Sequence, residues 1–282
     1  MEMNKLFDLE NNGLNMAADS HFLYIMGKRS INKYDLLTIK QAAHNDIFEK
    51  DGKSRSFIIC EEFIFLYDFC DLYVFDINTL MMIDKIRLGD DLKSDICGRM
   101  WSDSQKIYII IRNGEIVAMD IKTKKYNRHK ICDSTLDIYS ITENRIYAVS
   151  YSEIFYEIEK DTMQIIKTII LKNKVNDIYI PEGGVKYIIK KDKSIRAMDL
   201  KTFKIICTAK KAVSSSLANF IGIYNDNILI ADFGKITLWD AETLHPREKY
   251  FFPTGDYNKG VMLYKNKLYG SDYHSIYNAI ID

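Results

Sequence analysis

A turn of the form Asp-x-x-Thr recurs along the whole chain, and it constrains the fold more than any other feature of the sequence. Its threonines lie 39 to 44 residues apart, and one copy is degenerate, with glutamate in place of aspartate. An internal repeat of this length indicates an architecture built from one repeated unit. An aspartate that opens a turn accepts hydrogen bonds from backbone N–H groups two residues on, so structure alone explains the repeat. The copies are Asp35 to Thr38, Asp76 to Thr79, Asp120 to Thr123, Glu159 to Thr162, Asp199 to Thr202 and Asp240 to Thr243.

Two short strand-like runs precede each of these turns. Before the last copy they are Ile228 to Ala231 and Lys235 to Trp239, separated by Asp232-Phe233-Gly234. The runs are aromatic, β-branched and apolar on both faces, as expected of strands that are covered by sheets on either side. A period of about 40 residues with about four strands per repeat predicts the blades of a β-propeller, and 282 residues hold about seven of them.

The two ends of the chain each contain part of a blade. The copy from Leu268 to Asp282 stops where its fourth strand should begin, and Asn4 to Glu10 reads as a strand that belongs to no other repeat. We therefore predict a single all-β domain over residues 1–282, a seven-bladed β-propeller with four-stranded blades. The N-terminal strand completes the last blade and closes the ring, which removes a free sheet edge.

The repeat that ends in Trp239-Asp240 resembles a WD repeat, because a tight turn with Asp232 and Gly234 precedes it. The Gly-His pair typical of that family is missing, and other blades carry a different residue in place of the tryptophan. Those residues are Tyr34, Phe75, Met119 and Met198. The whole chain is similar to the broader bacterial propellers of the YVTN and quinoprotein-like type, a resemblance at the level of the superfamily. It implies the propeller fold, and fold alone does not imply a function.

Charge and cysteine content narrow the class of protein. A formal net charge of zero and a pI of about 7.0 argue against non-specific nucleic-acid binding, which needs a basic stripe. No apolar run is long enough to span a bilayer, and the N-terminus has no basic region followed by an apolar stretch. We therefore expect neither a membrane span nor a signal peptide. The five cysteines have no CxxC spacing, which predicts reduced thiols in the cytoplasm unless an export signal has been removed.

The turns between the second and third strands of the blades differ from repeat to repeat, and they form what we call the variable face. Strands alternate in direction within a blade, so these turns share one face with the blade-to-blade connections. The Asp-x-x-Thr turns then lie on the opposite face. Side chains that vary among equivalent turns are the natural candidates for recognition. The equivalent positions in successive blades are Gly27, Asp68, Arg112, Tyr151, Lys191, Asp232 and Asp272.

This alignment predicts a ligand site at the mouth of the central channel. Blades two, six and seven supply carboxylates, blades three and five supply cations, and an aromatic residue (Phe69, Phe233 or Tyr273) follows each acid. Opposed charges beside aromatic rings suit a zwitterionic ligand or a peptide segment. The alternative is that each aspartate only caps the backbone N–H groups of its own tight turn. The predicted site residues are Asp68, Arg112, Lys191, Asp232, Asp272 and Tyr273.

Two further residues extend the predicted site. His274 stands beside Asp272 on the variable face, where the two could hold a cation together with Asp232, and a surface histidine in a polar loop is the alternative. Arg99, on the innermost strand of blade three, either binds an anion in the channel or forms a salt bridge to a neighbouring aspartate. No His or Cys spacing fits zinc, and no nucleophile or phosphate-loop motif is present. We therefore predict no metal and no cofactor.

The leading prediction of function is a non-catalytic binding module that presents its variable face to a protein or peptide partner. It rests on the lack of a recognisable catalytic set and on a fold that serves widely as a rigid platform. The alternative is a small-molecule enzyme, such as a lyase, hydrolase or cyclase, with its site at the mouth of the central channel. A cofactor-dependent oxidoreductase has only the analogy of fold in its favour. Whether the protein is an enzyme therefore stays open, and the sequence predicts neither a nucleic-acid nor a membrane partner.

Overall fold

The computed structural model describes most of the chain. The described residues are 1, 3–9, 13–27, 29–47, 56–89, 96–171, 175–181, 185–190, 193–215, 218–252, 260–272 and 275–281. They fall into two compact units, one formed by residues 1–16 and 173–282 and the other by residues 17–172. This division into two units does not test the single domain expected from the sequence, which stays a prediction.

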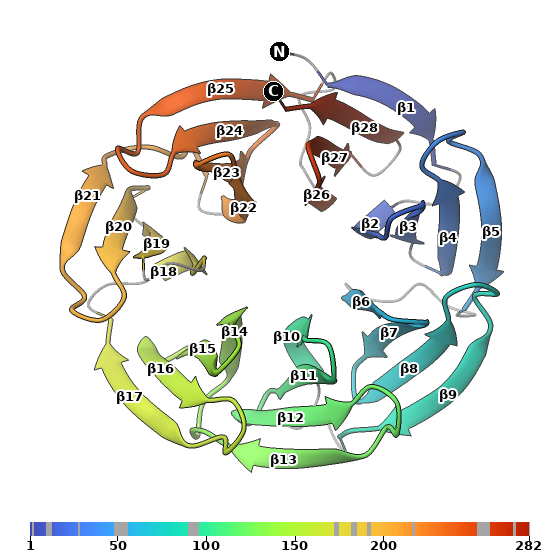
Figure 1. Ribbon diagram of the computed structural model, residues 1–282, viewed down its shortest axis with the longest axis horizontal. Coiled ribbons are helices and arrows are strands. Elements are labelled where there is room, and N and C mark those ends of the chain that lie inside the picture. The colour runs from blue at the N-terminus through green and yellow to red at the C-terminus, as the bar shows by residue number, and fades with distance from the viewer. Residues whose placement is uncertain are drawn as a thin grey trace. The chain divides into compact units, whose positions relative to one another are not determined.

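The described residues form seven antiparallel sheets of four strands each, which confirms the predicted seven-bladed β-propeller (Figure 1). In blades one to four, strands that are consecutive in the chain are neighbours in the sheet. Blade one consists of β2 (Gly13–Ala18), β3 (Phe22–Gly27), β4 (Ser30–Asp35) and β5 (Gln41–Asp46). Blade two consists of β6 (Phe57–Cys60), β7 (Phe63–Asp68), β8 (Asp71–Asp76) and β9 (Met82–Arg87). Blade three consists of β10 (Ile96–Ser102), β11 (Lys106–Ile111), β12 (Glu115–Asp120) and β13 (Tyr126–Lys130). Blade four consists of β14 (Leu136–Ile141), β15 (Arg145–Ser150), β16 (Ile154–Glu159) and β17 (Ile165–Ile170).

Blades five and six repeat this order, and blade seven combines strands from both ends of the chain. Blade five consists of β18 (Val175–Tyr179), β19 (Val185–Lys190), β20 (Ile195–Asp199) and β21 (Ile205–Ala209). Blade six consists of β22 (Asn219–Tyr224), β23 (Asn227–Asp232), β24 (Lys235–Asp240) and β25 (Pro246–Phe251). Blade seven consists of β26 (Gly260–Tyr264), β27 (Lys267–Ser271), β28 (Ser275–Ile280) and β1 (Asn4–Asp8).

The N-terminal strand completes blade seven, as predicted. β1 runs antiparallel to β28, with Asn4 opposite Asn278 and Asp8 opposite Ser275. The hydroxyl of Ser275 also donates a hydrogen bond to the carboxylate of Asp8 at 2.6 Å. The edge of β28 is therefore covered by β1 rather than left to pair with another chain.

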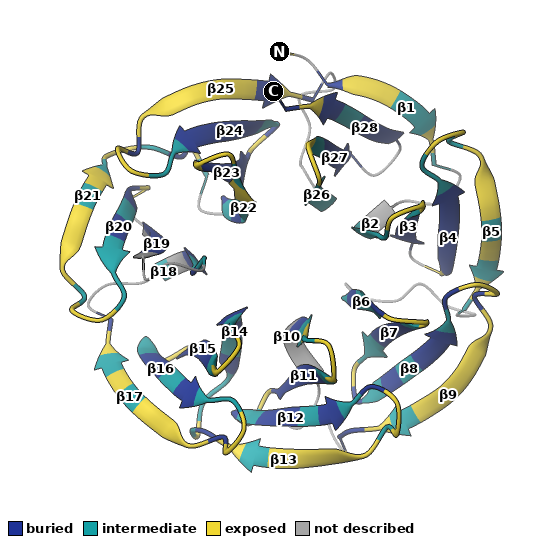
Figure 2. Ribbon diagram, in the orientation of Figure 1, coloured by how far each residue is buried: buried dark blue, intermediate teal, exposed yellow. Residues whose placement is uncertain are grey.

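The second and third strands of the blades are largely buried, and the fourth strands are largely exposed (Figure 2). Strand β11 shows why its sequence is apolar at every position. Ile107 and Ile109 belong to a cluster with blade two, whereas Tyr108 and Ile110 belong to a cluster with blade four. Successive side chains of a strand point to opposite faces, so a strand between two neighbouring blades must be apolar on both.

The Asp-x-x-Thr turns repeat one set of hydrogen bonds, as expected for a structural repeat. In blade two, Oδ1 of Asp76 accepts from the N–H of Asn78 at 3.0 Å and from the N–H and hydroxyl of Thr79 at 2.7 and 2.9 Å. The residue after the threonine has a left-handed backbone, with φ between 55° and 59°. For a residue other than glycine this conformation is unfavourable by roughly 1–2 kcal/mol. At Leu80 the burial of the whole side chain against blade one offsets this cost. The residues in this position are Ile39, Leu80, Lys124, Met163, Phe203 and Leu244.

Candidate functional site

The predicted site residues are divided between the two units of the chain. Asp68 and Arg112 lie at variable-face turns of the neighbouring blades two and three. Asp232 and Asp272 lie at those of the neighbouring blades six and seven. Because the two pairs belong to different units, the common channel mouth stays a prediction.

Four predicted positions have no described side chain. Lys191, Tyr273 and His274 lie outside the described residues, and Arg99 belongs to β10 with its side chain outside them. Their assignment to the site stays a prediction.

Asp232 ends β23 and is buried, with 5% of its surface exposed. Its Oδ2 accepts hydrogen bonds from the N–H and the hydroxyl of Ser214 at 2.6 and 2.7 Å. Its Oδ1 accepts from the N–H groups of Ser215 and Phe233 at 3.0 and 2.9 Å. The Lys235 ammonium lies 3.7 Å from Oδ2. Burial alone would raise the pKa of this carboxyl, but the hydrogen bonds, led by those of Ser214, lower it. Asp232 thus ties the segment before blade six to the tip of its own hairpin.

Asp272 follows β27 and is 6% exposed. Its Oδ1 accepts from the N–H of Ser275 at 2.8 Å, and its Oδ2 accepts from the hydroxyl of Tyr277 at 2.8 Å. Burial, followed by this hydrogen bond, raises the pKa of Tyr277. Each buried aspartate accepts a backbone N–H bond within its own turn, from Phe233 or Ser275, as in the capping alternative. Each also accepts bonds from groups beyond that turn, and their use by a ligand stays a prediction.

Asp68 and Arg112 are less enclosed. Asp68 is partly exposed at the end of β7, opposite Asp71 in the ladder. The carboxylate of Asp71 is paired with the ammonium of Lys85 at 2.9 Å. Arg112 is exposed, and its carbonyl accepts a hydrogen bond from the hydroxyl of Thr135 at 2.9 Å. Both predicted residues thus keep exposed surface on their turns.

Exposed aromatic side chains stand at the variable-face turns. Phe69, which follows Asp68, is 46% exposed, Tyr151 is 77% exposed and Phe233 is 56% exposed. Phe69 also has a left-handed φ of 53°, a conformation that is costly for any residue other than glycine. Aromatic side chains are enriched at protein interfaces, so these exposed rings are candidates for contact with a partner.

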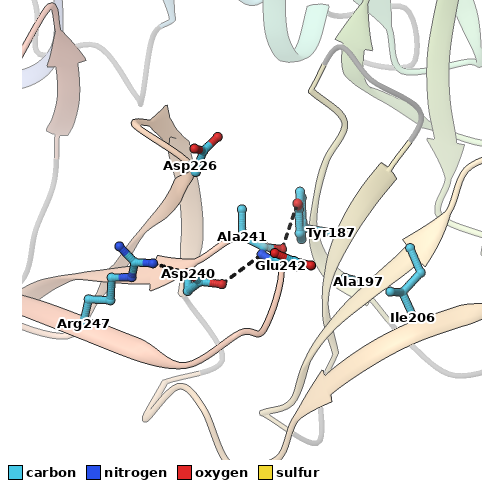
Figure 3. A pocket seen from close by; sticks show the side chains of 8 residues that line it. All are labelled: Tyr187, Ala197, Ile206, Asp226, Asp240, Ala241, Glu242 and Arg247. Atoms are coloured by element: carbon cyan, nitrogen blue, oxygen red, sulfur yellow. Dashed lines mark hydrogen bonds and ion pairs between the residues drawn. The ribbon is translucent and has the colours of Figure 1, made fainter.

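A pocket that the sequence did not predict lies between blades five and six (Figure 3). We call it the blade 5–6 pocket, and its volume is about 550 Å³. Sites for small ligands have volumes of this order and combine apolar walls with a few polar groups. The lining residues are Tyr187, Ala197 and Ile206 from blade five and Asp226, Asp240, Ala241, Glu242 and Arg247 from blade six.

Negative charge predominates in the blade 5–6 pocket. Oδ1 of Asp240 accepts from the N–H of Glu242 at 3.1 Å and from the N–H and hydroxyl of Thr243, both at 2.8 Å. The guanidinium of Arg247 pairs with Oδ2. The pKa of Asp240 is lowered to about 2, and the hydrogen bonds from Thr243 are the largest cause. The pairing with Arg247 lowers this pKa further. Arg247 compensates Asp240, so the exposed carboxylates of Asp226 and Glu242 leave an excess of two negative charges.

Blade five supplies the less polar wall of the pocket. The hydroxyl of Tyr187 donates a hydrogen bond to the carbonyl of Ala241 at 3.1 Å (Figure 3). Burial raises the pKa of Tyr187, so its phenol stays protonated at neutral pH. Ile206 is the extra residue of a β-bulge in β21. Bulges change the direction of a side chain, and Ile206 lines the pocket while 55% of its surface stays exposed.

Sequence reasoning missed this pocket because it treated the Asp-x-x-Thr turns as structural only. Asp240 does hold such a turn, and it lines the pocket as well. The signal that could have found the pocket is Ala197, two residues before the turn aspartate of blade five. Most other blades carry a larger residue there. These larger residues are Lys33, Val74, Glu157 and Leu238.

The described residues also bear on metal binding and on membrane insertion. They contain no group of three or more His, Cys, Asp or Glu side chains placed to hold a metal ion. In the same part of the chain, no helix is long and apolar enough to cross a membrane. Cys60, Cys70, Cys132 and Cys207 are free thiols, the first two buried and the others partly exposed.

Comparison with known proteins bears on the fold. No family model matches the chain, and no curated protein matches its sequence. A crystal structure of the computationally designed Ika8 protein matches with a TM-score of 0.75, covering 99% of this chain and 99% of that one at 11% sequence identity. A likeness at this identity establishes the fold alone. The chain has the β-propeller fold.

Proposed function

We propose that this β-propeller is a non-catalytic binding module that presents its variable face to a protein or peptide partner. The observation that carries the proposal is the exposure of Phe69, Tyr151 and Phe233 at equivalent turns. Large aromatic side chains supply much of the binding energy at protein interfaces. At the tips of hairpins, these rings are accessible to a partner without rearrangement of the blades.

The turn that carries Phe233 is held firmly. Asp232 accepts hydrogen bonds from Ser214, from Ser215 and from Phe233 itself. A side chain on a preorganised turn loses little freedom on binding, which favours affinity. The aspartate is already engaged by the backbone, and this favours recognition through the rings over recognition through its charge.

The superfamily and the compartment belong to the same proposal. We assign the chain to the WD-repeat-like, YVTN and quinoprotein-like propellers on its Asp-x-x-Thr blades and its single WD-like repeat. We assign it to the cytoplasm because its described cysteines, Cys60, Cys70, Cys132 and Cys207, are all free, as expected in a reducing compartment. A net charge of zero supports a protein partner over nucleic acid.

The test is capture of partners from a native lysate by the wild-type protein and by a triple variant, Phe69→Ala with Tyr151→Ala and Phe233→Ala. We expect the triple variant to keep its melting temperature and to lose the captured partner about tenfold or more. Leu37→Ala is the matched control, because Leu37 is 91% exposed but lies on an Asp-x-x-Thr turn. Full capture by the triple variant, or equal loss in the control, would refute the proposal.

A further inference from the structure

Blades one and two bury a lysine ammonium between them. Lys33, on β4, is only 5% exposed, and its Nζ donates a hydrogen bond to the carbonyl of Ile77 at 3.0 Å. The same Nζ lies 4.0 Å from the ring centroid of Phe22 and 5.5 Å from that of Tyr24, within the range of cation–π attraction. Ile77 is the residue that follows the turn aspartate, Asp76, of the next blade.

Blades two and three place an ammonium at the equivalent point from a different residue. Nζ of Lys124 donates to the carbonyl of Ile121, which again follows the turn aspartate of the later blade. It lies 3.4 Å from the ring centroid of Phe63 and 5.0 Å from that of Phe65, the counterparts of the two rings in blade one. The two interfaces therefore hold an ammonium at the same point. A lysine of the earlier blade supplies it in one interface, and a lysine of the later blade supplies it in the other.

Blades three and four also hold an ammonium at their interface. Lys160, the residue after the turn glutamate of blade four, donates to Oδ2 of Asp103 at 3.1 Å. The same oxygen accepts from the hydroxyl of Tyr108 at 3.0 Å, and Tyr108 is the blade-three counterpart of Tyr24. In residues 17–172, each of these three successive interfaces thus contains a lysine beside equivalent residues.

The interface between blades five and six has no lysine at the corresponding positions. The counterparts of Lys33, Lys160 and Lys124 are Ala197, Ala241 and Leu244. Ala197 pairs with Tyr187 in the ladder, and the corresponding pair of blade one is a lysine with a tyrosine. The space that a lysine fills elsewhere is here part of the blade 5–6 pocket, with its volume of about 550 Å³.

The pocket keeps groups that receive an ammonium. The carbonyl of Ala241 has a second lone pair besides the one that the hydroxyl of Tyr187 uses. The phenol oxygen of Tyr187 also accepts hydrogen bonds. Asp226 and Glu242 supply the excess of negative charge, and Ile206 offers apolar surface to an alkyl stem.

We propose that the blade 5–6 pocket binds a primary alkylammonium group, supplied either by a lysine side chain of a partner or by a free diamine. The template is the chain's own lysines, each a compact ammonium on a flexible apolar stem. The inference does not rest on the proposed function, because the pocket lies at the end of blade six opposite to the Phe233 turn. Failure of one proposal therefore leaves the other untouched.

The first test uses Nα-acetyl-lysine methylamide as the probe and the norleucine analogue as its control, which keeps the stem and lacks the ammonium. In NMR titrations followed at Ala197 and Ile206, we expect the lysine probe to bind and the norleucine analogue to bind about tenfold or more weakly. Ala197→Lys supplies an intramolecular ammonium, as Lys33 does in blade one, and should abolish binding. Equal affinity for the two probes, no binding of the lysine probe, or full binding by folded Ala197→Lys would overturn the proposal.

A second variant decides the matter if Ala197→Lys does not fold. Asp226 and Glu242 are exposed, so Asp226→Asn with Glu242→Gln should keep the fold and weaken binding of the lysine probe about tenfold. The matched control, Asp133→Asn with Glu143→Gln, removes two exposed carboxylates, one just before blade four and one within it, and should keep full affinity. Unchanged affinity in the pocket variant, or the same loss in the control, contradicts the proposed site.

A third probe, 1,5-diaminopentane, distinguishes the two sources of the ammonium. Weaker binding than the lysine probe identifies the side chain of a protein as the ligand, and tighter binding identifies a free diamine. Either result requires loss of binding in the pocket variant, and a diamine that binds the pocket variant as well as the wild type counts against the site.

Discussion

Two blade interfaces with the same strand pairing differ in what fills them. Between blades one and two, Lys33 is buried and hydrogen-bonded to the next blade, whereas between blades five and six Ala197 borders an open pocket. A buried ammonium is unfavourable unless it is hydrogen-bonded and compensated, and Lys33 has a carbonyl and two aromatic rings around it. The difference shows that blades with the same strand pairing leave a pocket at their interface where small residues replace the buried lysine.

Lys33→Ala should have the largest effect, because it opens the filled interface. The loss of the packed stem and of the hydrogen bond to Ile77 leaves a cavity and an unpaired carbonyl. We expect the free energy of unfolding to fall by about 2–4 kcal/mol, as measured by chemical denaturation. Lys40→Ala is the control, since Lys40 is exposed in the same blade and should cost less than about 0.5 kcal/mol. Equal stability of the two variants would mean that the buried ammonium has no structural role.

Tyr187→Phe tests the open interface in the same way and should have a smaller effect. The change removes the hydroxyl that donates to Ala241 and makes blade five resemble blade two, where Phe65 stands at the equivalent position. One hydrogen bond of this kind contributes about 1 kcal/mol to the free energy of unfolding. Tyr126→Phe, at an exposed tyrosine, should be neutral in the same thermal melts. A Tyr187→Phe protein as stable as the wild type would show that this bond does not hold the pocket wall.

The turn aspartates at the two interfaces should respond to different cations. At both, hydrogen bonds from the turn threonine are the largest cause of a lowered pKa, and Lys33 adds to the effect at Asp76 as Arg247 does at Asp240. We therefore expect Lys33→Ala to raise the pKa of Asp76 and Arg247→Ala to raise that of Asp240, in carboxyl NMR titrations. An unchanged pKa of Asp76 would show that the ammonium does not act across its interface.

The same lowered pKa values set the response of stability to acid. A carboxyl with a lower pKa in the folded than in the unfolded state stabilises the fold at neutral pH. This contribution falls as the pH drops through the range between the unfolded carboxyl value and the folded value, which is about 2 for Asp240. Melting temperatures should therefore decrease steeply in this range, and less steeply in Asp240→Asn.

The smallest expected effect concerns two cysteines, one at the interface of blades two and three and one beside the open interface. Cys60 is buried between blades two and three, and burial raises the pKa of its thiol. Cys207 is partly exposed near the pocket and donates to the carbonyl of Glu242 at 3.2 Å, and burial raises its pKa as well. We expect a thiol reagent to modify Cys207 slowly in the native protein and Cys60 only after denaturation. Mass spectrometry of the modified peptides measures both, and native modification of Cys60 would show that the interface between blades two and three opens.

The fold was predictable because its signals are local and repeated. The aspartate and threonine of each turn bond within four residues, and β1 was found because blade seven lacked one strand. The contacts of Asp232 were not predictable, since Ser214 and Ser215 lie in a connection without any periodic pattern. The blade 5–6 pocket depends on a small residue, Ala197, beside a turn of the next repeat. A single sequence gives no direct sign that such a pairing leaves open space.

The pairing of β1 with β28 also affects the order of events during synthesis. Asp8 and its hydrogen-bonded partner Ser275 are 267 residues apart. At about 5–20 residues per second, β1 leaves the ribosome roughly 13 to 53 s before its partner strand. During this interval the segment of β1 has no partner strand. The charges of Lys5 and Asp8, which lie 2.6 Å apart in the folded strand, disfavour pairing with other chains. Blade seven can therefore be completed only after the strands of the other six blades have been translated.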